Sequence, residues 1–249
     1  MALDIRLLGD TTLTSESGRV RASELPGPIG RHVLTRLIID PFPIGRSRLI
    51  DDIWGADPPR AVESVLNATL SRIRSSLAPL GFDSRDLIAS TSGTVNFKRP
   101  KGTRVDIEIA HHDIDLAVRD VRSGDLREAA QRAAVVYSIS RRPLLTGIER
   151  DWLDVERDRM HHVERRALGL LCEVALRSDR LDEAVQLGRE HVRIAPFDER
   201  AHLLLVRALE QSGNSSGARK VVKDFTARLR DELDVEPSSD FLGALSTIS

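Results

Sequence analysis

Cysteine is almost missing from this sequence of 249 residues, since Cys172 is the only one. A single thiol excludes an internal disulfide framework and suits a reducing compartment. The apolar residues around Cys172 predict a buried structural thiol rather than a nucleophile. The N-terminus has no basic stretch followed by an apolar run, and no apolar stretch approaches 18 residues. We therefore expect a cytoplasmic protein without a signal peptide or a membrane span.

Aromatic residues are also scarce, at 4% of the chain, whereas apolar residues make up 41% and charged residues 30%. These values are typical of a soluble globular protein. With so few aromatics, the cores must be built mainly from Leu, Val, Ile and Ala. The length suits one large or two medium domains.

Sequence signals of catalysis are missing as well. No G-x-x-x-x-G-K-S/T phosphate-binding loop occurs. Neighbouring residues on a helix point about 100° apart, so adjacent histidines cannot easily share a metal ion. This argument applies to both adjacent pairs, His111-His112 and His161-His162. His161 with Glu164 is the best ligand pair that remains. We expect no enzyme activity, no catalytic or metal-binding residue and no cofactor.

The net charge of −1 hides an asymmetry between the two parts of the chain. Residues 1–104 hold 15 Lys and Arg against 11 Asp and Glu, whereas the remaining residues hold 22 against 27. A basic part followed by an acidic part fits a nucleic-acid-binding module joined to a part that does not touch phosphate.

The basic part shows an ordered series of short elements. Hydrophobic periodicity and turn residues predict strands within residues 3–22, helices at 29–40, 47–54 and 59–80, and a β-hairpin at 87–97. Ser47 is a candidate N-cap of the second helix. This is the order of a winged helix-turn-helix, in which the second of two adjacent helices enters the major groove.

The long helix predicted at residues 59–80 has two distinct faces. Its apolar stripe consists of Leu66, Leu70, Ile73 and Leu77. One flank of the stripe carries side chains that bond phosphates and base edges, namely Arg60, Asn67, Ser71 and Arg74, with Ser64 close by. Taken alone, the pattern is more typical of an ordinary surface helix with a solvated polar face. The order of the neighbouring elements favours DNA binding.

From residue 105 onward the pattern is helical. Three similar segments begin at Ser123, Ser178 and Ser212. Ala184 and Ala218, in the second and third segments, lie 34 residues apart, which is the tetratricopeptide period. We predict an all-α, tetratricopeptide-like array with an additional long helix near residues 148–177. The alternative is a plain helical bundle that dimerises.

The charged run Glu149–Arg166 is interpreted as a solvated helix face with ion pairs one turn apart. Trp152 and Leu153 lie in the same segment. We expect them to lock this helix against the repeats rather than to contact a partner.

Five segments, in this order, are similar to those of a known family. They are Leu49–Pro59 (LIDDIWGADPP), Leu70–Leu77 (LSRIRSSL), Asp151–Met160 (DWLDVERDRM), Ala195–Arg200 (APFDER) and Glu232–Pro237 (ELDVEP). Through them the chain resembles a Streptomyces antibiotic regulatory protein (SARP) type transcription activator over about residues 3–240. The resemblance implies an α+β, OmpR-type winged helix-turn-helix at residues 1–104. It also implies an all-α, tetratricopeptide-like bacterial transcriptional activation domain at residues 105–249.

The resemblance further implies a recognition helix at Arg60–Leu80 and a wing at Ser90–Phe97. Arg72 lies off the base-facing flank and is expected to reach a backbone phosphate. Two departures from the family concern the wing, which lacks the usual Pro and Tyr, and Asn67, which stands where Gln is frequent. The complete set of expected DNA-binding residues is Arg48, Arg60, Ser64, Asn67, Ser71, Arg72, Arg74, Ser92, Thr94 and Lys98.

The partners that the resemblance implies are double-stranded promoter DNA with direct repeats, RNA polymerase, and a second copy of the chain, at least on DNA. The predicted function is therefore that of a sequence-specific, DNA-binding transcription activator. The alternative is a tetratricopeptide-like interaction adaptor whose winged helix has lost DNA binding.

Overall fold

A computed structural model describes residues 2–91 and 93–246 of the protein. Its first sheet has four strands. Its order is β3-β2-β1-β7, made of β1 (Leu3–Arg6), β2 (Thr12–Ser15), β3 (Arg19–Arg21) and β7 (Arg104–Val105). The three predicted strands form an antiparallel meander, and β7 pairs with β1 in parallel. Leu3, Ile5 and Val20 are buried while their neighbours in sequence are exposed, because successive side chains of a strand point to opposite faces.

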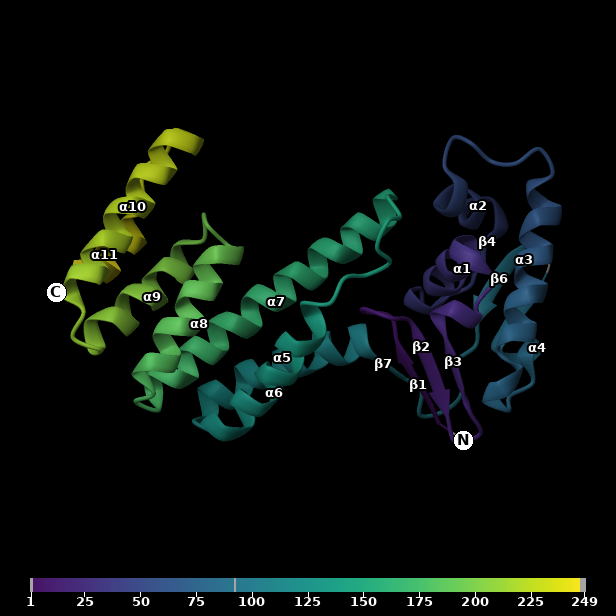
Figure 1. Cartoon of the computed structure of the whole chain (residues 1–249), viewed down its shortest axis with the longest axis horizontal. Helices are drawn as coiled ribbons and strands as arrows, with labels where there is room; N and C mark the ends of the chain where they lie inside the picture. Colours follow the sequence, from purple (N-terminus) through teal and green to yellow (C-terminus); the bar gives the residue numbers. More distant parts are fainter. Residues whose placement is uncertain (1, 92, 247–249) are drawn as a thin grey trace. The chain divides into compact units, whose positions relative to one another are not determined.

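The helix-turn-helix and the wing follow in the predicted order (Figure 1). The elements are α1 (Gly27–Ile39), β4 (Ile44–Gly45), α2 (Arg46–Trp54), α3 (Val62–Ser76), α4 (Ser84–Leu87), β5 (Ile88–Thr91) and β6 (Thr94–Phe97). Two 3-10 turns, at Ala22–Glu24 and Ala78–Leu80, complete the series. The hairpin of β5 and β6 gains β4 as a third strand, in the order β4-β6-β5.

Two details at the helix starts differ from the prediction. Helix α2 begins at Arg46 with Gly45 as its N-cap, so Ser47 is not the cap. Helix α3 begins at Val62, which leaves Arg60 in the turn before it. The predicted apolar stripe of α3 is confirmed, because Leu66, Leu70, Ile73 and Leu77 are all at most 1% exposed.

Asp106 joins the first sheet to the start of α5 (Asp106–Ser123). Its carboxylate accepts hydrogen bonds at 3.0 Å from the backbone N–H groups of Leu7 and Leu8, and one at 2.9 Å from Ile107. The residue is only 8% exposed. A buried backbone donor needs a partner, and here a side chain about 100 residues away in sequence supplies it for the segment that follows β1.

The second half of the chain is helical, as predicted. Its helices are α5 (Asp106–Ser123), α6 (Leu126–Ser140), α7 (Asp151–Arg177), α8 (Leu181–Ile194), α9 (Glu199–Gln211), α10 (Ser215–Leu233) and α11 (Ser239–Ser246). Within the described part of the chain, no helix combines the length and the apolar character that a membrane crossing needs.

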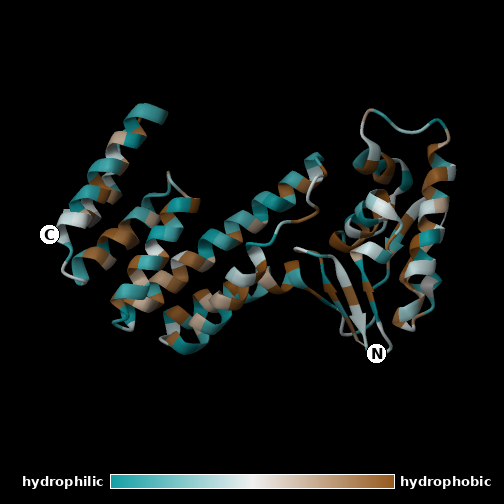
Figure 2. Cartoon of the chain, in the orientation of Figure 1, coloured by the Kyte–Doolittle hydropathy of each residue, from teal (hydrophilic) through white to brown (hydrophobic). Residues whose placement is uncertain are grey.

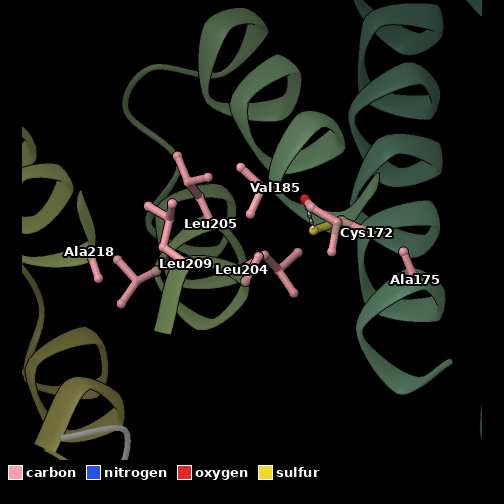
Figure 3. Packing of buried hydrophobic residues seen from close by; sticks show 10 residues of the cluster. Cys172, Ala175, Val185, Leu204, Leu205, Leu209 and Ala218 are labelled. Atoms are coloured by element: carbon pink, nitrogen blue, oxygen red, sulfur yellow. Dashed lines mark hydrogen bonds between the residues drawn. The ribbon is translucent and has the colours of Figure 1, made fainter. Parts of the chain in front are cut away.

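The repeat predicted from Ala184 and Ala218 is visible in the packing. Both residues occupy the first turn of a helix, α8 and α10 respectively, and both are at most 1% exposed. Helix α9, which is coloured mostly hydrophobic in Figure 2, lies between these two helices. Figure 3 shows its Leu204, Leu205 and Leu209 among side chains of α7, α8 and α10. Small residues at the helix starts let the α9 leucines fill the space between the helices.

Gly188 marks the closest approach of α8 to α9. A Cβ atom at this position would lie 3.1 Å from Leu205 Cα. Gly188→Val is expected to lower the free energy of unfolding by about 1–3 kcal/mol, because overpacking displaces the facing helix. Urea unfolding followed by circular dichroism measures the change. The matched control is Gly243→Val in α11, where a Cβ would meet no atom within 4 Å. Equal losses in the two variants would contradict the close approach as the cause.

The chain forms two compact units, of which the first comprises residues 1–109 and 142–160 and the second comprises residues 110–141 and 161–249. The first ten residues of α7 therefore pack with the sheets and helices of the N-terminal unit. The division into functional domains at residue 104 stays a prediction.

Trp152 makes the clearest contacts between these first residues of α7 and the rest of the first unit. Its ring stacks on His32 of α1 at 5.3 Å between centroids, and the Arg36 guanidinium lies 5.3 Å over the Trp152 ring. Its Nε1 donates a hydrogen bond to the Asp52 carbonyl at 3.1 Å. The expectation that Trp152 locks α7 against the repeats is therefore wrong. The residue instead binds the start of α7 to α1 and α2.

Candidate nucleic-acid interface

The outer face of α3 carries the polar residues predicted to meet DNA. Ser64, Asn67, Ser71 and Arg72 are all exposed on this helix. Arg60 in the preceding turn and Arg48 on α2 are exposed as well. The structure thus exposes six of the ten predicted residues on α2, on α3 and in the turn before α3.

Arg46, at the start of α2, is a residue of this face that the sequence analysis missed. Its guanidinium donates to Glu63 Oε2 at 2.6 and 2.9 Å, to Asn67 Oδ1 at 2.8 Å and to Ser90 Oγ at 3.3 Å. One side chain therefore connects α2, α3 and β5. The helical wheel of α3 could not reveal it, because Arg46 belongs to another element.

The contacts of Arg46 change what its neighbours present to solvent. Glu63 is the acidic residue of the face, and its carboxylate is neutralised by this ion pair. The amide oxygen of Asn67 is already engaged, while no hydrogen bond of its amide nitrogen to the described residues is observed. Asn67 therefore presents a free amide donor at the surface, while its oxygen already accepts one hydrogen bond.

Arg74 binds the wing instead of projecting freely. Its Nε and one terminal nitrogen each donate to the Ile88 carbonyl at 3.0 Å. Burial, followed by repulsion from Arg85, lowers the pKa of the guanidinium from its ordinary value, which still leaves it protonated in a protein. Contact of Arg74 with a base stays a prediction, and it would require both hydrogen bonds to break.

The wing is fixed to α2 through its turn. Gly93 has a φ of +87°, which only glycine adopts readily, and its carbonyl accepts a hydrogen bond from the Arg46 N–H at 2.9 Å. Thr94 shares a hydrogen bond with Thr91 at 3.1 Å between hydroxyls, and Lys98 is exposed beyond β6. Ser92 lies outside the described residues.

A shallow groove runs along the side of the α3 face opposite to the wing. Its volume is about 380 Å³, and it lies between the N-terminal turn of α1 and α3. Ser64 and Arg72 line it on the α3 side, and Pro28 and Ile29 on the α1 side. The face thus has a wing side, held by Arg46, and an α1 side, where Arg72 is exposed.

The residues considered for other chemistry have ordinary structural roles. Cys172 is buried as predicted, and burial, with a smaller effect of Glu173, raises the pKa of its thiol to about 12. His161 Nδ1 lies 3.5 Å from Glu164 Oε2. Among the described residues, no group of three or more His, Cys, Asp or Glu side chains is arranged to hold a metal ion.

Comparisons with known proteins give a consistent result. A family model described as bacterial transcriptional activator domain matches residues 105–246. Regulatory protein AfsR of Streptomyces coelicolor is 27% identical over 190 residues, which cover 76% of this chain and 18% of that protein. Transcriptional regulatory protein EmbR of Mycobacterium tuberculosis is 27% identical over 250 residues, which cover 94% of this chain and 60% of that protein.

A solved structure of Mycobacterium tuberculosis EmbR, in complex with a low affinity phosphopeptide, is similar to the whole chain. It superposes with a TM-score of 0.89 at 20% identity and covers 99% of this chain and 64% of that chain. The predicted fold classes, a winged helix-turn-helix and an all-α helical array, are thereby confirmed. The chain spans less than two thirds of the length of each of these relatives.

Proposed function

The chain belongs to the bacterial transcriptional activator domain family, and from this membership we propose that it activates transcription by binding promoter DNA in a sequence-specific way. The predicted resemblance to SARP-type regulators is confirmed by the same match and by the similarity to AfsR and EmbR. In this proposal residues 1–104 bind DNA, and residues 105–249 act in activation.

The observation that supports DNA binding most is the exposed face of α3 between α2 and the wing. A helix at this place in a winged helix-turn-helix enters the major groove. Ser64, Ser71 and Arg72 would bond phosphates or base edges there, and Arg48 and Arg60 would add phosphate contacts. Lys98 and Thr94 would do so beside the wing.

The hydrogen bond between Arg46 and Asn67 restricts the bases that the face would prefer. An Asn side chain that recognises adenine uses its oxygen and its nitrogen together. Here the oxygen already accepts from Arg46, which weakens the paired contact to adenine and leaves the free amide N–H₂ for single acceptors such as guanine O6 or thymine O4 in the major groove. We expect Asn67 to favour such an acceptor as long as Arg46 holds it.

Arg72→Ala is expected to weaken binding to every DNA sequence by a similar factor and to reduce the slope of log affinity against log salt by about 1. The reason is that Arg72 is expected to meet a phosphate, which carries no sequence information. Fluorescence anisotropy with a specific and a random duplex measures both effects. The control is Arg19→Ala, which removes another exposed cation from β3 of the same unit. A loss confined to the specific duplex would instead make Arg72 a base contact.

The proposed function itself is tested by titrating the protein against DNA from beside its own gene between 50 and 200 mM salt. A DNA-binding protein loses affinity steeply over this range, by about 10³–10⁵ for 6–10 phosphate contacts. Binding that shows neither salt dependence nor sequence preference would contradict the proposal. It would leave the alternative of an interaction adaptor with a degenerate winged helix.

We extend the proposal to two partners that the family resemblance implies. A homodimer on direct repeats should give a footprint with two protected half-sites in the same orientation. Contact with RNA polymerase should give protein-dependent transcription from the same promoter in a purified system. A single protected half-site would contradict the dimer without affecting DNA binding by one copy.

A further inference from the structure

The second unit contains a hollow that the proposed function does not use. It has a volume of about 280 Å³ and lies between α7, α8 and the start of α9. The lining residues that matter below are Arg165, Arg166 and Gly169 of α7, His191 of α8, and Asp198 and Arg200 at the start of α9. Three of these side chains are guanidinium groups, and only one is a carboxylate.

His191 brings an unsatisfied polar atom to this hollow. The residue is 2% exposed, and its Nδ1 has no hydrogen-bond partner among the described residues. A buried polar atom left without a partner is unfavourable, because it has lost its hydrogen bonds to water without replacing them. A ligand in the hollow that hydrogen-bonds to Nδ1 would remove this cost.

Gly169 gives access to the same edge of the His191 ring. A Cβ at residue 169 would lie 3.1 Å from His191 Cε1 and 3.7 Å from Nδ1. Any side chain there would press against the ring and cover Nδ1. The absence of a side chain leaves this edge of His191 next to the hollow.

The charges around the hollow favour an anion. Arg166 forms an ion pair with Asp115 at 2.7 Å, and Arg200 forms a longer one with Glu173 at 3.3 Å. No ion-pair or hydrogen-bond partner of Arg165 is observed among the described residues. An unpaired guanidinium beside two others is a typical partner of a phosphate, which it binds through two parallel hydrogen bonds.

The carboxylate and the histidine of the hollow have partners or surroundings that define their roles. Asp198 caps α9, because its Oδ1 accepts from the Arg200 and Ala201 N–H groups at 2.9 and 3.3 Å. Burial, with repulsion from nearby cations, lowers the pKa of His191 from its ordinary value, although Asp198 acts in the opposite direction. The ring is therefore neutral near pH 7 and able to donate one N–H.

We propose that this hollow binds a small molecule through a phosphate group, which Arg165 and Arg200 grip while His191 Nδ1 donates a hydrogen bond to it. The volume lies just below the range of about 300–1,000 Å³ that is typical of drug-sized ligands. It thus fits a phosphate with few further atoms, and not a length of peptide. All its residues belong to the second unit, and none lies within residues 1–104, which are proposed to bind DNA.

Isothermal titration calorimetry of the full chain with inorganic phosphate and with glycerol 3-phosphate, at constant ionic strength, tests the proposal. We expect saturable binding to one site. Arg165→Gln should weaken it by at least about tenfold, because a charge-assisted pair is lost. The control is Arg189→Gln, the same change at an exposed position of α8 outside the hollow, which should weaken it less than about twofold. The probe that binds more tightly shows whether the free ion or a monoester is the ligand.

A second variant tests the geometry. Gly169→Ala keeps every charge but places a methyl group against His191, so it should weaken phosphate binding while circular dichroism shows the helical content unchanged. Three results would overturn the proposal. They are no saturable binding of either probe, equal weakening by Arg165→Gln and Arg189→Gln, and binding of a phosphoserine peptide without binding of the two small probes.

Discussion

Replacing Asp106 with alanine is expected to lower the free energy of unfolding of the first unit by about 3–6 kcal/mol, because three buried donors left without a partner cost about 1–3 kcal/mol each, partly offset by removal of a carboxylate that burial disfavours. The N–H groups of Leu7, Leu8 and Ile107 all lose their acceptor in this variant. Two of them belong to the segment directly after β1. The third is in the first turn of α5. The junction between sheet and helix would therefore open.

Tryptophan fluorescence during urea unfolding measures this effect selectively. The chain has two tryptophans, Trp54 and Trp152, and both belong to the first unit. The matched control is Asp4→Ala on β1, whose carboxylate is 63% exposed and lies 3.8 Å from Arg104 Nε. Such an exposed pair contributes about 0–1 kcal/mol. The loss of unfolding free energy in Asp106→Asn should lie between those in Asp4→Ala and Asp106→Ala, because the amide keeps one acceptor oxygen. Equal losses in Asp4→Ala and Asp106→Ala would refute the role assigned to the buried carboxylate.

The sequence predicted those elements whose pattern repeats over many residues. The stripe from Leu66 to Leu77 and the 34-residue spacing of Ala184 and Ala218 are such patterns, and the structure buries all these residues. Strand β7 has only two residues, too few for an alternation to be recognised. Its pairing with β1 depends on contacts across about 100 positions, which periodicity cannot reveal.

The site was predicted less completely than the fold, because it depends on tertiary contacts between different helices and strands. A helical wheel predicts the direction in which a side chain points. It does not predict which groups on other elements bind that side chain. Arg74 and Asn67 were placed on the flank of α3 that is expected to face DNA, yet Ile88 and Arg46 already engage them. Trp152 was assigned to the wrong partner for the same reason. The apolar face of α7 packs on an apolar surface, and the sequence does not show whether that surface belongs to the repeats or to α1 and α2.

Acidification from pH 6.5 to 4 is expected to remove about 3 kcal/mol of stability from the first unit through His32 alone. Burial of His32 against the Trp152 ring lowers the pKa of the imidazole to about 4, helped by Arg150 and Arg36 and opposed by Asp52. In the unfolded chain the pKa returns to about 6.5. Between these values the unfolded state binds one more proton than the folded state. Stability is therefore complete above pH 6.5, falls as the pH decreases, and levels off near pH 4.

Other groups titrate in the same range, so the measurement must isolate His32. Burial also lowers the pKa of His191 and His202, but both lie in the second unit, which contains no tryptophan. We expect the fluorescence-detected stability of His32→Phe, which preserves an aromatic ring beside Trp152, to depend less on pH than that of the wild type. The two curves should diverge by about 1.4 kcal/mol per pH unit below 6.5. Trp152→Ala exposes His32 and should flatten the curve in the same way. Parallel curves for wild type and His32→Phe would mean that His32 is not held neutral by this contact.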